Sequence, residues 1–198
     1  TPKPSSAASD VYKRQEYKRA DQIGRVFQDP KKGTCDELTI LENMALADNK
    51  HKAYGLSRGV NKRRTDYYRT LLETCGMGLE DRLNVKAGTL SGGQRQALAL
   101  ILANMTDIEL LILDEHTAAL DPKSSETVMR ITDKLVKEKQ VTSLMVTHNL
   151  RFALEYGSRL VMMHEGRCVL DVRGEEKQKL EIDALLKVFN EISVECGN

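Results

Sequence analysis

The spacing of apolar residues changes at about residue 109, and the change separates two kinds of predicted structure. Before this point apolar positions recur at helical spacing, and CDELTILENMALA predicts a short helix from about 39 to 47. From residue 109 the run ELLILDE is continuously apolar up to its two final carboxylates. That pattern is typical of a strand buried on both faces of a parallel sheet. The chain therefore combines helices with buried strands.

Two more helices are predicted in the first half. NKRRTDYYRTLLETCGMG offers Asn61 as a cap and Gly76 as a stop, and another helix begins just after Ser91. The basic residues 62 to 64 fit the solvated first turns of a helix or a contact with nucleic acid. A formal charge of +1 gives no reason to expect nucleic acid.

The second half alternates strands and helices. Strands are predicted in VTSLMVTH and, as a pair, around the His-Glu-Gly turn of RLVMMHEGRCVLDV, and one further strand is predicted in the first half, at 23–28 (IGRVFQ). Asp121 and Pro122 start a helix, NLRFALEYG is a short helix, and an amphipathic helix closes the chain. The apolar positions of this last helix are Ile182, Leu185, Leu186, Phe189 and Ile192. The order predicts a doubly wound α/β domain with a separate helical lobe.

Composition agrees with this fold class. The 198 residues suffice for one domain with a real core, or for a large domain that lacks a piece. Aromatic residues make up 5% and Trp is absent, which favours a helix-rich α/β protein over a sandwich. The four cysteines form no C-x-x-C pair, which fits a reducing compartment. The longest apolar stretch, ALALILANM, is far shorter than the roughly 20 residues of a membrane span.

The first fifteen residues, TPKPSSAASDVYKRQ, differ in composition from the rest of the chain. They contain Pro, Ser and Ala without any apolar period. We interpret them as a non-native segment and exclude them from the prediction of the fold. A disordered native tail is the alternative.

Candidate chemistry begins with two carboxylates. Asp114 and Glu115 end the buried strand, where ligands of open α/β sheets gather. Asp114 could hold Mg²⁺, and Glu115 could orient or deprotonate an attacking water. A helix cap with a solvated neighbour is the alternative. Gln28 and His148 also follow strands, and each could contact a phosphate site or be an ordinary residue at a strand end.

The stretch LSGGQ, residues 90 to 94, precedes an apolar helix. Ser91 can cap that helix, and the amides of Gly92 and Gly93 can face an anion at its positive end. Glycine also removes the Cβ atoms that would prevent close approach. A simple glycine turn is the alternative. A loop of this kind normally works beside G-x-x-x-x-G-K-[ST], and no window of the chain contains that motif.

These signals stand in a specific order: Gln28, a helical lobe, LSGGQ, LLILDE, AALD and then His148. In this order the chain resembles the nucleotide-binding subunit of an ATP-binding-cassette (ABC) transporter, from about residue 16 to near its end. The resemblance implies a P-loop NTPase-like sheet with helices on both faces. It divides the chain into a helical subdomain at 36–106, a core at 107–175 and a C-terminal helix at 178–193.

The resemblance implies a role for each motif. Gln28 corresponds to the Q-loop residue, which touches Mg²⁺ and the attacking water. Ser91, Gly92, Gly93 and Gln94 correspond to the signature that binds a nucleotide held by the opposite subunit. Asp114 matches the Walker B acid, Glu115 the catalytic base, Asp121 the D-loop and His148 the switch histidine. ATP and Mg²⁺ are the implied cofactors.

The chain departs from the family pattern in two places. Many relatives have Pro after the catalytic Glu, where this chain has His116, and we interpret this as subfamily variation rather than a second catalytic group. The P-loop and the strands around it are expected before residue 16 and are absent from the sequence. We therefore expect an open apolar slot beside TSLMVT, and a chain that is inactive alone although its full-length parent hydrolyses ATP.

The implied function is an ATPase on the cytoplasmic face of the cell membrane that drives transport of a small solute, such as one of the amino-acid type. Its implied partners are a second nucleotide-binding subunit in a head-to-tail dimer, transmembrane permease subunits and a substrate-binding protein, with no nucleic acid. A soluble ABC-type ATPase acting on ribosomes or chromosomes is one alternative, although heptads and a second signature are missing. A non-catalytic interaction subunit is another.

Overall fold

The computed structural model describes residues 22–50 and 59–195, with backbone only at 189 and 191–195. The predicted tail at 1–15 and the positions Phe189 and Ile192 of the last helix lie outside the described residues and side chains. The chain forms two compact units, Thr1–Val146 and Thr147–Asn198. Each unit has its own elements, described in turn below.

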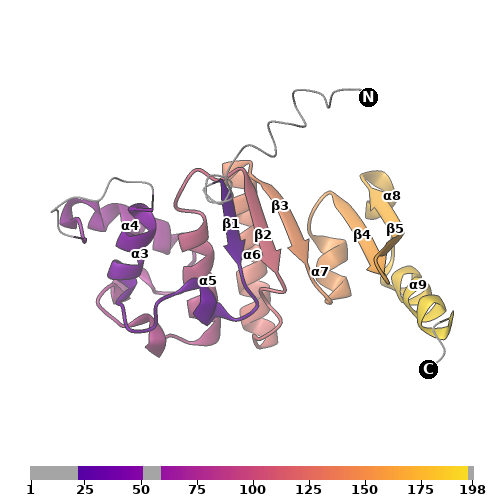
Figure 1. Ribbon diagram of the computed structural model, residues 1–198, viewed down its shortest axis with the longest axis horizontal. Coiled ribbons are helices and arrows are strands. Elements are labelled where there is room, and N and C mark those ends of the chain that lie inside the picture. The colour runs from indigo at the N-terminus through magenta and orange to yellow at the C-terminus, as the bar shows by residue number, and fades with distance from the viewer. Residues whose placement is uncertain (1–21, 51–58, 196–198) are drawn as a thin grey trace, which may run out of the picture. The chain divides into compact units, whose positions relative to one another are not determined.

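Three parallel strands form the sheet of the first unit. They are β1 (Ile23–Val26), β2 (Leu110–Asp114) and β3 (Thr142–Val146), in the order β1-β2-β3 (Figure 1). Val26 pairs with Leu113, and Asp114 pairs with Val146. Because parallel strands end at the same edge, the segments that follow β1 and β2 leave the sheet side by side.

Strand β1 is shorter than predicted. The predicted strand at 23–28 stops at Val26, and the turn η1 (Pro30–Gly33) follows almost at once. Asp29 starts this turn by accepting a hydrogen bond from the backbone N–H of Lys31 at 3.0 Å, while Pro30 supplies a fixed φ. Phe27 and Gln28 therefore form a connection rather than the end of the strand.

The prediction that VTSLMVTH is a buried strand was wrong. Its paired part is β3, and the side chains of Leu144 and Val146 are 56% and 48% exposed. Within the described sheet β3 lies at the edge, so one side of it has no neighbouring strand. Leu144 and Val146 therefore expose apolar side chains on this edge strand of the described sheet, and the open slot expected beside TSLMVT stays a prediction.

Four longer helices complete the first unit: α3 (Ile40–Asp48), α4 (Thr65–Glu73), α5 (Gly92–Ala103) and α6 (Pro122–Lys139). Figure 1 shows α3, α4 and α5 gathered beside β1, with α6 behind the sheet. Thr39 and Ser91 cap α3 and α5 with reciprocal capping boxes, and Asp121 caps α6. Short 3-10 turns connect them: η2 (Lys62–Arg64), η3 (Glu80–Arg82) and η4 (Ala87–Thr89).

Asn61 caps η2 rather than α4, because its side chain accepts from the N–H of Arg63. Gly76 follows α4 with φ +61, as expected of a glycine that stops a helix. A single core joins the helices to the sheet. Its fully buried members include Ile40, Met44, Leu72, Leu98, Leu100, Leu111 and Leu113.

The second unit contains α7 (Leu150–Glu155), β4 (Arg159–His164), β5 (Arg167–Arg173), α8 (Glu175–Gln178) and α9 (Ile182–Glu195). β4 and β5 pair antiparallel around the predicted His-Glu-Gly turn. Glu165 (φ 44) and Gly166 (φ 75) are both left-handed, as a two-residue type I′ turn requires. Within the described residues, no helix of either unit has the length and apolar character to cross a membrane.

Candidate functional site

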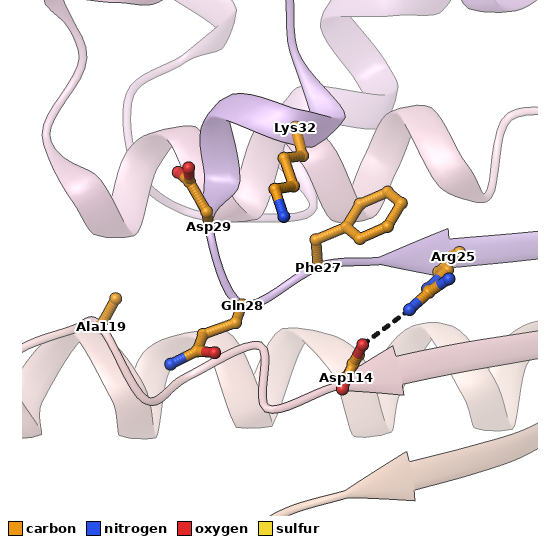
Figure 2. A pocket seen from close by; sticks show the side chains of 7 residues that line it. All are labelled: Arg25, Phe27, Gln28, Asp29, Lys32, Asp114 and Ala119. Carbon is orange, nitrogen blue, oxygen red and sulfur yellow. Dashed lines mark hydrogen bonds and ion pairs between the residues drawn. The ribbon is translucent and has the colours of Figure 1, made fainter.

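A pocket of about 530 Å³ opens at the edge of the sheet where β1 and β2 end. Arg25, Phe27, Gln28, Asp29, Lys32, Asp114 and Ala119 line it (Figure 2). Gln28 and Asp114, which lie far apart in the sequence, thus share one pocket because parallel pairing places the ends of their strands together. Ala119, from the AALD segment, reaches the same pocket.

Asp114 forms an ion pair that the sequence did not reveal. The Nη2 atom of Arg25 lies 2.8 Å from its Oδ2 atom, and the two side chains are 51% and 41% exposed (Figure 2). The guanidinium also lies 4.7 Å from the ring centre of Phe27. Solvent screens such a half-exposed pair, so it holds the carboxylate in place at little net gain in stability. The residue pattern did not predict this ion pair, because Arg25 lies in the middle of a short strand and belongs to no motif.

Glu115 directly follows Asp114 and has an unusual backbone. Its φ is 45, a left-handed conformation that costs a non-glycine residue of order 1 kcal/mol. Two hydrogen bonds hold it: its N–H donates to the carbonyl of Val146 at 2.9 Å, and its carbonyl accepts from the N–H of Ala118 at 2.9 Å. The turn after β2 is therefore fixed to the edge of the sheet.

His116 anchors the same turn from inside. Its side chain is 2% exposed, and its Nε2 lies 3.2 Å from the Oγ1 of Thr132 on α6. Thr132 donates its hydroxyl proton to the carbonyl of Val128 at 2.8 Å, so its oxygen must accept from an Nε2–H of a neutral imidazole. Burial lowers the pKa of His116 to about 4. These contacts support the interpretation of His116 as a structural residue.

Acid is expected to destabilise the chain through His116. The unfolded imidazole, with an ordinary pKa near 6.5, binds a proton that the folded one does not bind until the pH reaches about 4. Stability should therefore fall with falling pH between these values, by about 2 kcal/mol between pH 7 and pH 5. Urea unfolding of the chain at both pH values measures this loss. In His116→Gln most of the loss should disappear, and an equal pH dependence in both proteins would refute the assignment.

The LSGGQ stretch forms the start of α5, as predicted. The Oγ of Ser91 accepts from the N–H of Gln94, and the side chain of Gln94 accepts from the N–H of Ser91, both at 3.3 Å. Ser91 and Gly92 are exposed, whereas Gly93 is buried. The exposed tip, Ser91 and Gly92, thus lies at the start of a helix, the usual place for an anion.

The amide of Gln94 is already bound within the chain. Its Nε2 donates to the carbonyl of Met77, and its Oε1 accepts from Nη1 of Arg82, both at 3.2 Å. The side chain therefore connects the helix tip to the segment after α4. Sequence reasoning missed this use of Gln94 because Met77 and Arg82 belong to no motif.

The two signature glycines face different surroundings. A Cβ on Gly93 would lie 2.9 Å from both Cβ and Oγ of Ser124, at the start of α6. A Cβ on Gly92 would meet only the Cδ2 tip of Leu120, at 3.3 Å. Gly93 thus permits close packing of α5 on α6, a need separate from any phosphate contact. The helix tip and the AALD segment lie next to each other in this chain.

Substitution by Ala should destabilise the chain at Gly93 but hardly at Gly92. Gly93→Ala is expected to lower the free energy of unfolding by about 1–3 kcal/mol through overpacking, and Gly92→Ala by less than about 0.5 kcal/mol. Adding Ser124→Gly to Gly93→Ala removes the opposing atoms and should restore much of the loss. Thermal and urea unfolding of the chain test this. Equal losses at the two glycines, or no recovery in the double variant, would contradict the packing role.

Asp121 caps α6, with its Oδ1 accepting from the N–H of Ser124 at 3.1 Å. The hydrogen bonds from Ser124 lower the pKa of this exposed carboxylate. His148 belongs to the second unit, where it is exposed and precedes the cap of α7. That cap is Asn149, whose Oδ1 accepts from the N–H of Phe152 at 3.2 Å.

The donors in the pocket fit Mg²⁺ rather than a softer metal. Asp114 and Gln28 offer carboxylate and amide oxygens, the ligands that Mg²⁺ prefers. Among the described residues, no group of three or more His, Cys, Asp or Glu side chains could hold a metal ion. Mg²⁺ commonly binds through one or two protein oxygens together with substrate phosphates and water, so the sparse set is compatible with it.

Comparison with known proteins decides the family. The family model described as ABC transporter matches residues 5–118, more than half of the chain. The chain belongs to the ABC transporter family. It is also 49% identical over 174 residues to the tyrosine transport ATP-binding protein of Clostridioides difficile (strain R20291), across 88% of this chain and 69% of that protein.

More distant members of the family are similar over less of their length. The phosphonates import ATP-binding protein PhnC 1 of Rhodopseudomonas palustris (strain HaA2) is 29% identical across 86% of this chain. The energy-coupling factor transporter ATP-binding protein EcfA2 of Bacillus thuringiensis (strain Al Hakam) is 34% identical across 78% of it. The chain spans 59% and 50% of these two relatives.

Solved structures agree on the fold, that of a P-loop NTPase-like ABC cassette. The dimeric ATP-binding cassette MJ0796 bound to ADP and Pi matches with a TM-score of 0.63 and 27% identity, over 86% of this chain and 68% of that one. The cbiO1 protein of Clostridium perfringens, part of the complex cbiONQ, matches with a TM-score of 0.66 and 24% identity. That match covers 90% of this chain and 66% of cbiO1.

Proposed function

We propose that this ABC-family chain works within a complete cassette, meaning the chain together with a segment that bears a P-loop, and that the complete cassette hydrolyses ATP. One observation carries the proposal: Gln28 and Asp114 line one pocket at the edge where β1 and β2 end. Glu115 is fixed to the same edge by its bond to Val146. This is where ligands of open α/β sheets bind.

Each side chain takes one part in that reaction. Mg²⁺, when bound with ATP, would neutralise charge on the transferred phosphoryl group. Asp114 and Gln28 would hold the ion, directly or through water. Glu115 accepts a proton from the attacking water, and the fixed turn keeps its carboxylate from drifting away from that water. For His148, which belongs to the second unit, the role of switch histidine is supported by its place in the order of motifs.

The signature tip serves a nucleotide held by a second subunit. Ser91 and Gly92 are exposed at the start of α5, and Gln94 is bound to Met77 and Arg82. Ser91 and the backbone N–H groups therefore make the phosphate contacts, while Gln94 shapes the tip. Asp121, in the adjacent D-loop, lies at the dimer interface. The solved cassette dimer with ADP and Pi supports a paired arrangement.

The transported solute is proposed from similarity alone. The 49% identical relative is named for tyrosine transport, so an amino-acid-type solute is the best supported choice. Permease subunits and a substrate-binding protein would complete the transporter at the cytoplasmic face of the cell membrane. A ribosomal or chromosomal ATPase is less well supported, because the three named relatives are transport proteins.

Activity should depend on the P-loop. The 198-residue chain contains no G-x-x-x-x-G-K-[ST] sequence, and the backbone amides, Lys and hydroxyl of that loop supply most phosphoryl positioning. We expect ATP turnover by the complete cassette and none above background by the chain alone, measured as phosphate release. A catalytically dead Glu115→Gln cassette gives the background. ATP turnover by the isolated chain would refute the proposal that activity requires the P-loop segment.

A further inference from the structure

The connection that carries Gln28 is attached to one side of the signature helix. Side chains at positions 95, 96 and 99 of α5, on one helical face, contact the segment from Phe27 to Asp36. The Nε2 of Gln96 donates to the carbonyl of Phe27 at 3.0 Å. A Cβ on Gly33 would lie 2.9 Å from the Cβ of Ala99, so the turn η1 lies directly against the helix.

Arg95 holds the far end of the segment. Its side chain is 7% exposed, its Nη1 lies 3.1 Å from Oδ1 of Asp36, and its Nε and Nη2 donate to the carbonyl of Ala87 at 3.2 and 3.0 Å. A buried guanidinium with these partners is costly to move, because each lost hydrogen bond would leave a charge desolvated. The segment around Gln28 is thus fixed at both ends by neighbouring residues of α5.

Gln96 bonds to the peptide group that joins Phe27 to Gln28. It is fully buried, and among the described residues its Oε1 has no hydrogen-bond partner. A buried amide with half of its capacity unused is costly for an apolar helix face, so packing alone does not explain it. The bond it does make fixes the plane of the peptide between Phe27 and Gln28. The Cα atom of Gln28 lies in that plane, so the bond holds the backbone from which the Gln28 side chain extends.

We propose that Gln96 is a positioning residue that sets Gln28 in the pocket and ties Gln28 to the signature helix of the same chain. This rests on the proposed function, because it assigns Gln28 to the reaction. One rigid helix then carries the tip that meets the partner's nucleotide and the contact that orients Gln28. Displacement of the tip displaces Gln28, and closure of one site is transmitted to the other.

Hydrogen exchange on the 198-residue chain tests whether Gln96 holds the segment that contains Gln28 in place. Gln96→Leu and Gln96→Met both remove the donor, and we expect the amides of residues 28–34 to exchange about tenfold faster in each. Asn104→Leu is the matched control, since it removes another buried amide, at the C-cap of α5, that donates to the carbonyl of Leu100. Unchanged exchange in both Gln96 variants, or the same acceleration in the control, would overturn the proposal.

Kinetics of the complete cassette test whether Gln96 affects ATP turnover through Gln28. Gln96→Leu should lower kcat about five- to tenfold with KM for ATP within twofold, because orientation is lost but nucleotide contacts remain. The double variant Gln28→Ala/Gln96→Leu should be no slower than Gln28→Ala, since Gln96 acts only through Gln28. A fully additive loss overturns the proposal. Wild-type turnover by Gln28→Ala would instead refute the proposed role of Gln28 itself.

Discussion

Glu115→Gln is expected to lower ATP turnover of the complete cassette by about 10²- to 10⁴-fold, the usual contribution of a general base. The substitution removes the proton acceptor and keeps the size of the side chain. The left-handed backbone at this position is held by bonds to Val146 and Ala118, which do not involve the carboxylate. Phosphate release measures turnover. Light scattering should show that ATP-driven dimerisation is retained or strengthened.

Glu109→Gln provides the matched control. Glu109 precedes β2, at the opposite end of the strand from Glu115, and its carboxylate accepts from the side chain of Gln22 at 2.5 Å. Neutralising this carboxylate should leave turnover within about twofold, as expected for a surface substitution away from the site. Ordinary turnover by Glu115→Gln would remove the base role from Glu115, whatever the control shows.

Ser91→Asp is expected to abolish ATP-driven dimerisation and to lower turnover by about 100-fold or more, while leaving the fold intact. Asp caps a helix as well as Ser does, so the free energy of unfolding should change by less than about 0.5 kcal/mol. In the proposed dimer the added negative charge stands where the partner's γ-phosphate would bind, and like charges at close range strongly disfavour binding. Light scattering with ATP and phosphate release give the two readings.

Ser91→Asn separates charge from shape. Asn is also a good cap and is similar in size to Asp, but it is neutral. We expect it to retain dimerisation and a substantial part of the activity. Equal defects in the two variants would show that the hydroxyl itself, and not the sign of the charge, decides the contact. Normal dimerisation by Ser91→Asp would remove the signature tip from the nucleotide site.

Much of the fold could be predicted because its signals are local. Helix starts and stops depend on neighbouring residues, as at the caps Ser91 and Asp121 and at the left-handed Gly76. The residue types at these positions therefore predict where the helices begin and end. The buried strand β2 was readable from its apolar run. β3 has a similar run but lies at the edge of the described sheet, because strand burial depends on neighbours that its own sequence does not encode.

The candidate site was predictable only in part, for the same reason. Gln28 and Asp114 were identified from their places after strands, and parallel pairing brings them into one pocket. Arg25, Arg95 and Gln96 were missed, because their partners are 89, 59 and 69 residues away and belong to no motif. Long-range polar contacts of this kind follow from packing, which periodicity does not reveal.

The central claim is that the signature tip and the Asp-Glu strand end of one chain act on two different nucleotides. Mixing Glu115→Gln cassettes with Ser91→Asp cassettes tests it most directly, because each variant alone has two defective sites per dimer. If the sites are shared across a head-to-tail dimer, the mixed dimer regains one intact site, and turnover should rise clearly above that of either variant alone. The recovery should stay below about a quarter of the wild-type value, which is the value for random pairing of equal amounts, because Ser91→Asp weakens dimerisation. If each chain completes its own site, mixing restores nothing, and turnover that stays at the level of the separate variants would contradict the account.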